Sequence, residues 1–90
     1  MSRITRNGLQ LVVDRINTIT KSPMQAYVNG IPQEGCFCLD NAYNGYSLHR
    51  MQGNSGEQDV LQCGYLKPSE LLPIMYAWIR GYNFAKDNIL

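Results

Sequence analysis

The pair Asn44-Gly45 constrains the fold of this chain more than any other feature of its sequence. Asparagine and glycine tolerate the positive φ angles of a type I′ turn, so the pair predicts a two-residue loop between two antiparallel strands. Such a loop sets Tyr43 opposite Tyr46 and Leu39 opposite Arg50. Every inference about which hairpin residues share a face depends on this register.

The predicted register divides the hairpin into two faces of different polarity. The more apolar face carries Phe37, Leu39, Asn41, Tyr43, Tyr46, Leu48 and Arg50. The opposite face carries Cys36, Cys38, Asp40, Ala42, Ser47, His49 and Met51. Antiparallel sheets commonly pack one face on the core and leave the other solvated, so we expect the first face to meet the helices.

The N-terminal part of the chain has the period of an amphipathic helix. Its apolar residues recur at intervals of three and four, at Leu9, Val12, Val13, Ile16 and Ile19. Thr5 is a suitable N-cap and Ser22-Pro23 closes the segment, which predicts a helix over about residues 5–19. Asn17 falls outside this apolar stripe, so we expect it to face solvent.

A second apolar stripe lies near the C-terminus, at Leu71, Leu72, Met75, Trp78, Ile79 and Tyr82. The predicted helix begins near Ser69-Glu70 and ends at Gly81, because glycine is a common residue at helix ends. Pro73 has no backbone N–H. Either the helix starts near Leu72, or Pro68 opens it and Pro73 bends it.

Four short strand candidates separate the two helices, at residues 25–28, 36–39, 46–51 and 60–65. The order of elements predicts a single α+β domain over residues 1–90. In it, an antiparallel β-meander of three to four strands is flanked by an N-terminal and a C-terminal helix packed on one face. Residues 83–90 are expected to form a tail anchored by Phe84, Ile89 and Leu90.

Charge and hydropathy exclude several classes of protein. Eight Lys and Arg residues face seven Asp and Glu residues, and the net charge of +1 argues against a general polyanion binder. No apolar run approaches the roughly 18 residues that a membrane span needs, and the N-terminus has no signal-peptide core. We therefore expect a soluble cytoplasmic protein.

The three cysteines do not form the even, widely spaced set of a small secreted domain. We expect reduced thiols that behave as small buried hydrophobes. A zinc site of three cysteines and one histidine would use Cys36, Cys38, Cys63 and His49. The usual C-x₂-C spacing is missing, however, so we expect no metal. A chain this small buries a limited core, which favours a homo-oligomer.

A hydrolase triad is the other catalytic arrangement that the hairpin suggests, because Asp40, Ser47 and His49 share a face. The sequence has no strained nucleophile elbow and no evident oxyanion hole, which favours a surface Asp–His pair instead. It also lacks a phosphate loop, a dinucleotide fingerprint and a calcium loop. We expect neither enzymatic activity nor a cofactor.

Arg50 is the exception on the apolar face of the hairpin. In the predicted register its side chain lies near Leu39, with Tyr43 and Tyr46 further along. An arginine in this place must reach water, a carboxylate or a ligand anion. Two interpretations remain open: a structural pair with an Asp or Glu, or a contact to phosphate beside stacking tyrosines.

The stretch Leu39–Met51 (LDNAYNGYSLHRM) resembles a motif, A-Y-G-G-Y-x-L-x-R, of small uncharacterised proteins of tailed bacteriophages. The matching residues are Ala42, Tyr43, Gly45, Tyr46, Leu48 and Arg50. Further matches follow at Gly64-Tyr65, at Lys67–Leu71 (KPSEL), and at Trp78, Arg80 and Gly81. Asn44 replaces a glycine of the motif, and Pro68-Ser69 replaces its basic residue and neighbour, which weakens an anion site at that helix start.

The resemblance implies a phage accessory protein that acts in the host cell cytoplasm, in counter-defence or host takeover. We expect a non-enzymatic, oligomeric binding protein that occludes a host or defence protein or sequesters a small nucleotide signal. Tyr43 and Tyr46 would stack on a base or form an interface hot spot, next to the turn residue Asn44. Arg50 and Lys67 would contact phosphate or an acidic partner.

A nucleic-acid-binding function is the alternative, because the element order loosely resembles that of double-stranded-RNA-binding domains. Those domains carry a basic cluster at the start of their last helix. This chain offers Lys67 alone at that place. We therefore regard nucleic acid as a disfavoured partner.

Overall fold

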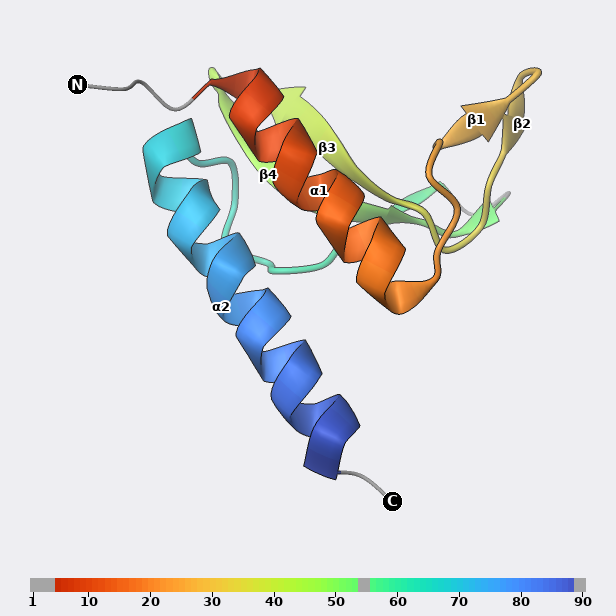
Figure 1. Cartoon of the computed structure of the whole chain (residues 1–90). Helices are drawn as coiled ribbons and strands as arrows, with labels where there is room; N and C mark the ends of the chain where they lie inside the picture. Colours follow the sequence, from red (N-terminus) through yellow and green to blue (C-terminus); the bar gives the residue numbers. More distant parts are fainter. Residues whose placement is uncertain (1–4, 54–55, 89–90) are drawn as a thin grey trace.

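The computed structural model describes residues 5–53 and 56–88, and it places two helices against a small antiparallel sheet (Figure 1). The elements are α1 (Arg6–Thr20), β1 (Tyr27–Val28), β2 (Ile31–Pro32), β3 (Phe37–Ala42), β4 (Gly45–Met51), β5 (Glu57–Asp59) and α2 (Pro68–Asn88). Strands β3, β4 and β5 form an antiparallel sheet in that order, and β1 pairs with β2 in a separate hairpin. The predicted α+β class with a helix at each end is confirmed.

Two strand predictions need correction. The first candidate, residues 25–28, contributes only β1, and this strand pairs outside the main sheet. The last candidate, residues 60–65, is not a strand, because β5 ends at Asp59. Beyond β5 a single backbone bridge, Tyr46 to Leu66, returns the chain to the sheet. The main meander therefore has three strands among the described residues.

Helix α1 forms as its sequence predicts. The Thr5 hydroxyl accepts a hydrogen bond from the Gly8 N–H at 3.4 Å, which makes Thr5 the N-cap. At the other end Lys21 adopts a left-handed conformation, and its N–H bonds to the last carbonyls of the helix. The apolar stripe of α1 is buried against the sheet and α2.

The central turn lies one residue earlier than predicted. Tyr43 and Asn44 have φ angles of 53° and 59°, so they are the two central residues of the turn, and Gly45 is the first residue of β4. Leu39 therefore pairs with Leu48, and Arg50 pairs with Phe37. Moving a two-residue turn by one position shifts each cross-strand partner by two residues. Because side chains alternate with a period of two, the predicted faces survive the wrong register.

The hydrophobic core lies between the helices and the predicted apolar face of the hairpin. Its buried members are Leu9, Val12, Val13, Ile16, Phe37, Leu48, Leu71, Met75 and Ile79. Both helices contribute to this one cluster, so both pack on the same face of the sheet (Figure 1).

Asn17 is 1% exposed, and the prediction that it faces solvent is wrong. Its Nδ2 donates to the Phe37 carbonyl at 2.9 Å, and its Oδ1 accepts from the Phe37 N–H at 2.8 Å. Phe37 begins the edge strand β3, whose outer backbone groups have no neighbouring strand. The amide of Asn17 supplies the two bonds that a neighbouring strand would make there.

Helix α2 begins at Pro68 and contains Pro73, which is the second of the two alternatives drawn from the sequence. The Glu70 carboxylate accepts from the Lys67 N–H at 3.1 Å, one half of a capping box. The predicted end at Gly81 is wrong, because the helix continues to Asn88. Gly81 keeps a helical φ, and Trp78 stacks on Tyr82 across it with ring centroids 5.5 Å apart.

The predicted tail is therefore helical over residues 83–88, and this part of α2 extends beyond the sheet (Figure 1). Phe84 is 70% exposed and anchors nothing. Ile89 and Leu90, the other predicted anchors, lie outside the described residues. Neither helix has a stretch long and apolar enough to cross a membrane within the part of the chain described.

Candidate functional site

Arg50 lies near the end of the central strand β4 and packs over Phe37 of the core. Its Nε donates to the Gly35 carbonyl at 3.2 Å, and its guanidinium sits over the Phe37 ring, 4.9 Å from the centroid. The described residues contain one ion pair, His49–Glu57, and no carboxylate among them lies within ion-pairing distance of Arg50. The interpretation of Arg50 as half of a structural ion pair is therefore wrong.

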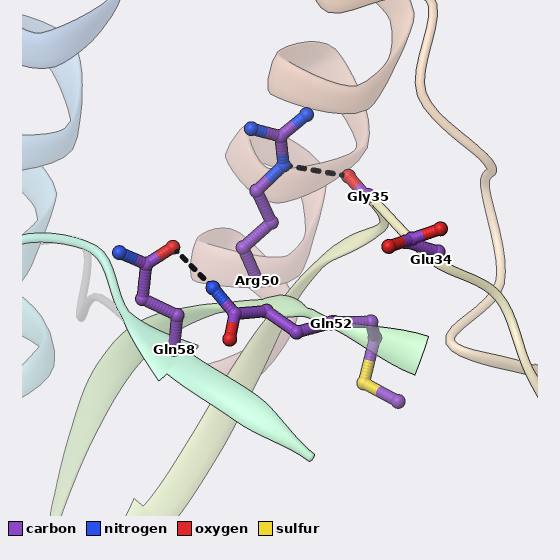
Figure 2. A pocket seen from close by; sticks show the side chains of 6 residues that line it. Glu34, Gly35, Arg50, Gln52 and Gln58 are labelled. Carbon is purple, nitrogen blue, oxygen red and sulfur yellow. Dashed lines mark hydrogen bonds between the residues drawn. The ribbon is translucent and has the colours of Figure 1, made fainter. Parts of the chain in front are cut away.

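An open hollow of about 540 Å³ adjoins the Arg50 side chain. It is lined by Glu34, Gly35, Arg50, Met51, Gln52 and Gln58. Gln52 Nε2 donates to Gln58 Oε1 at 2.9 Å, and the terminal nitrogens of Arg50 point away from this pair (Figure 2). The hollow thus presents a guanidinium, two side-chain amides and the Glu34 carboxylate, which are groups that recognise polar or charged ligands.

The two predicted tyrosines occupy different environments. Tyr43 is 89% exposed at the turn and packs one edge against Tyr65, with ring centroids 5.5 Å apart. Tyr46 is half-buried against the core, and its backbone pairs with Leu66 through bonds of 2.8 and 2.9 Å. Asn44 is exposed beside Tyr43. Tyr43 is free to contact a partner, whereas Tyr46 is largely structural.

The structure does not bring the predicted site residues together. Tyr43 lies in the turn before β4 and Arg50 lies near the other end of that strand, which at the usual rise per residue separates them by about 20 Å. Lys67 is exposed and follows Leu66, so it lies near the Tyr46 end of the strand. Arg50 is four positions from Tyr46 on the same strand, about 13 Å at the usual rise per residue, so it does not act beside either tyrosine.

The opposite face of the sheet carries a polar cluster from all three strands. His49 Nδ1 lies 2.9 Å from Glu57 Oε1, and the Tyr65 hydroxyl donates to the Asp40 carboxylate. The Ser47 hydroxyl donates to Asp59 at 3.3 Å, so it is not paired with His49. The three residues considered as a hydrolase triad therefore do not form a nucleophile–base pair.

The cysteines differ in burial, and only part of the prediction holds. Cys36 is buried, Cys38 is half-buried and Cys63 is exposed, and all three are free thiols. Burial raises the pKa of Cys36. Burial and then the charge of Glu57 raise the pKa of Cys38 to about 12. Cys36 and Cys38 therefore stay protonated at neutral pH and are poor nucleophiles.

One group of residues in 5–53 and 56–88 brings metal-ligand atoms within 4.8 Å of one another. It consists of Asp40, His49 and Glu57. No cysteine belongs to this group. The sequence placed Asp40 and His49 on one face but gave no sign of Glu57, because β5 was assigned to the wrong residues. A prediction of β5 at residues 57–59 would have identified Glu57 as a neighbour of His49.

Comparison with protein-family models, with curated proteins and with solved structures gives no significant match.

Proposed function

We propose that this chain is a non-enzymatic binding protein that occludes a partner protein, with the β1–β2 hairpin as its main contact surface. The observation that carries the proposal is the exposure of apolar side chains on and beside that hairpin. Those side chains belong to Met24, Tyr27, Val28 and Ile31. The hairpin projects from the body of the molecule (Figure 1).

A projecting hairpin with two-residue strands is a weak structure on its own. Two-stranded hairpins are marginally stable in water, and exposed apolar clusters typically mark interaction surfaces. Asn29 and Gly30 form its turn with φ angles of 52° and 78°, which holds Val28 opposite Ile31. Burial of these side chains against a partner would stabilise the hairpin and the complex together.

The Arg50 hollow extends this surface. The chain runs from β2 into Glu34 and Gly35, which line the hollow and hold Arg50. Tyrosine and arginine are the residues most enriched among interface hot spots. The surface therefore suits a protein with an apolar patch beside groups that can hydrogen-bond to Arg50. From the resemblance to phage accessory proteins, we infer a host or defence protein in the host cell cytoplasm.

Affinity capture from a phage-sensitive bacterial lysate, followed by mass spectrometry, tests the proposal. The wild-type chain should retain a specific protein, and the Tyr27→Ser/Ile31→Ser variant should lose it. Leu11→Ser is the matched control, because Leu11 is 71% exposed on α1, away from the hairpin. Equal retention of that protein by the hairpin variant would contradict the proposed surface.

Sequestration of a nucleotide signal is a second candidate, favoured by the unpaired terminal nitrogens of Arg50 and the two glutamine amides. Glu34 in the same hollow weighs against an anionic ligand, so we rank this candidate lower. Thermal unfolding with a panel of cyclic nucleotides should give concentration-dependent stabilisation that Arg50→Ala removes. If no cyclic nucleotide raises the Tm, the nucleotide-sequestration candidate is excluded.

The alternative of duplex RNA binding has less support. Lys67 stands at the start of α2 beside Glu70, whose negative charge would repel a phosphate. We also propose that the free chain forms a homo-oligomer through the same hairpin, in competition with the partner protein. Light scattering should then give a mass above the 10.2 kDa of one chain.

A further inference from the structure

The C-terminal part of α2 has a side that nothing covers within the described chain. The buried residues of the helix belong to the core, and residues 83–88 extend beyond the sheet (Figure 1). On another side, exposed residues recur at intervals of four, three and four, which is the spacing of a coiled-coil seam. This seam consists of Ala77, Gly81, Phe84 and Asn88, with Ala85 beside it. Such spacing is typical of a helix that pairs with another helix.

The side chains of the seam differ strongly in size. Phe84 is 70% exposed. A Cβ atom at Gly81 would meet no atom within 4 Å, so the surface above Gly81 is open. A second copy of the helix that runs antiparallel can set its own Phe84 over this glycine. The small residues Ala77 and Ala85 on either side let two helix axes approach to about 8 Å, the lower end of the usual range.

Arg80 and Asp87 flank the seam along the same side. They are about two helical turns apart, both are exposed, and neither forms an ion pair within the described residues. When Phe84 of one copy lies over Gly81 of an antiparallel copy, Arg80 of each copy comes beside Asp87 of the other. A parallel pair in register would instead place like charges at the same level. The charges therefore match a second, antiparallel copy of this helix.

We propose that residues 77–88 of α2 pair with the same residues of a second copy, antiparallel and about a two-fold axis. Such an axis makes every contact occur twice, so the dimer contains two Phe84–Gly81 contacts and two Arg80–Asp87 pairs. The core lies against the first half of α2, so the two bodies lie at opposite ends of the helix pair (Figure 1).

This interface is independent of the β1–β2 hairpin, which lies on other elements of the chain. The helix pairing leaves the hairpins of both copies free to contact partner proteins. A dimer with two hairpins binds an oligomeric partner more tightly than one chain does, because its second contact is intramolecular.

Sedimentation equilibrium tests the pairing in a chain that carries Tyr27→Ser/Ile31→Ser, so that association through the hairpin does not contribute. Between about 1 μM and 1 mM the mass should rise from the 10.2 kDa of one chain toward twice that value. Adding Phe84→Ser should keep the chain monomeric over this range. Leu11→Ser is the matched control, because Leu11 is 71% exposed on α1 and should leave the dimer intact. A monomer at the highest concentration would overturn the helix pairing and leave the hairpin proposal untouched.

Charge reversal in the same hairpin variant tests the antiparallel alignment. Arg80→Glu and Asp87→Lys should each weaken the dimer about 10-fold, because two attractive pairs become repulsive. An equimolar mixture of these two variants should form a mixed dimer with about the original affinity, since both contacts then join opposite charges. Lys86→Glu is the control, because Lys86 follows Ala85 and precedes Asp87 in the sequence but lies about 100° away from Asp87 around the helix. A dimer that responds to neither Arg80→Glu nor Asp87→Lys would overturn the proposal.

Discussion

Asn17 joins α1 to the sheet through two hydrogen bonds to the backbone of a single residue, Phe37. Because both partners are buried, a side chain that cannot make these bonds leaves a donor and an acceptor without water or protein partners. Asn17→Ala should therefore lower the free energy of unfolding by about 2–4 kcal/mol. Asn7→Ala, at an exposed position of the same helix, should change it little.

Urea unfolding followed by circular dichroism measures this difference. Equal midpoints for Asn17→Ala and Asn7→Ala would show that the two bonds to Phe37 contribute no stability. Asn17→Asp separates the two bonds, because aspartate keeps an acceptor for the Phe37 N–H but loses the donor to its carbonyl.

The sequence predicted a need for glycine at position 45, but the structure gives a different reason for it. The sequence assigned it to the turn because glycine tolerates a positive φ, but its φ is not positive. A Cβ atom there would lie 2.9 Å from the Tyr65 carbonyl carbon and 3.0 Å from the Leu66 nitrogen. These are backbone atoms held by the Tyr46–Leu66 bridge, so they cannot move aside easily.

Gly45→Ala should consequently destabilise the fold by about 1–3 kcal/mol, the range typical of overpacking. Differential unfolding in urea, with the wild type as reference, is the measurement. An unchanged midpoint would mean that the segment around Leu66 can retreat from β4 at no cost.

The sequence did not reveal the burial of Asn17 or the close approach at Gly45, for related reasons. Asn17 lies four residues after Val13, at the edge of the buried stripe, but its polarity assigned it to solvent. Its partner on β3 is twenty residues away, and Leu66 lies twenty-one residues after Gly45. Local patterns indicate which face a residue occupies, but they contain no information about a distant backbone that closes on it.

At the scale of elements, the sequence predicted both ends of α1 to within about a residue but did not predict the end of α2. Thr5 and Pro68 each carry a chemical property that suits the start of a helix, and both helices begin beside them. Glycine ends a helix only where it adopts a left-handed φ. Gly81 does not, because Trp78 and Tyr82 stack across it and favour continuation.

Gly81→Ala tests this account of α2. A Cβ atom at Gly81 would meet no atom within 4 Å, and alanine is about 1 kcal/mol more favourable than glycine inside a helix. The variant should raise the helical signal and the Tm slightly. It is the opposite of Gly45→Ala, since the same substitution stabilises at an open helical site and destabilises at a crowded strand site.

The two Asn-Gly pairs of the chain lead to different backbone structures because their surroundings differ. Asn29-Gly30 forms the β1–β2 turn, whereas the β3–β4 turn is formed by Tyr43 and Asn44 and not by Asn44-Gly45. Gly45 is committed to the contact with Leu66, so the turn moves back one residue and forces Tyr43 to a φ of 53°. An exposed tyrosine in this conformation costs free energy, which favours a role for Tyr43 in contact with a partner.

At the scale of the whole molecule, the sequence predicted the layers but not the grouping of its site residues. The alternation of side chains assigned the faces correctly, so the core could be anticipated. The distance between Arg50 and Tyr43 depends on the position of one turn, which was predicted one residue too late in the chain. Among the strands, two separate candidate surfaces result: the apolar hairpin with Arg50, and the polar cluster at His49 on the other face of the sheet.

The polar face also governs how the stability of the whole fold depends on pH. The pKa values of Cys38 and Tyr65 are both raised to about 12 in the folded chain, from ordinary values of about 9 and 10. Both groups hold their protons more tightly when folded, so the unfolded chain releases protons first as the pH rises. Their contribution to stability is complete below about pH 9 and is lost progressively toward pH 12.

Urea midpoints measured between pH 7 and 11, with a chelator present, should therefore fall steeply above pH 9. Tyr65→Phe and Cys38→Ser should each make that fall shallower, because each variant removes one proton that the folded chain retains. Tyr27→Phe, on the exposed hairpin, should follow the wild type. If all four proteins lose stability in parallel, the raised pKa values of Cys38 and Tyr65 do not determine how the stability of the fold depends on pH.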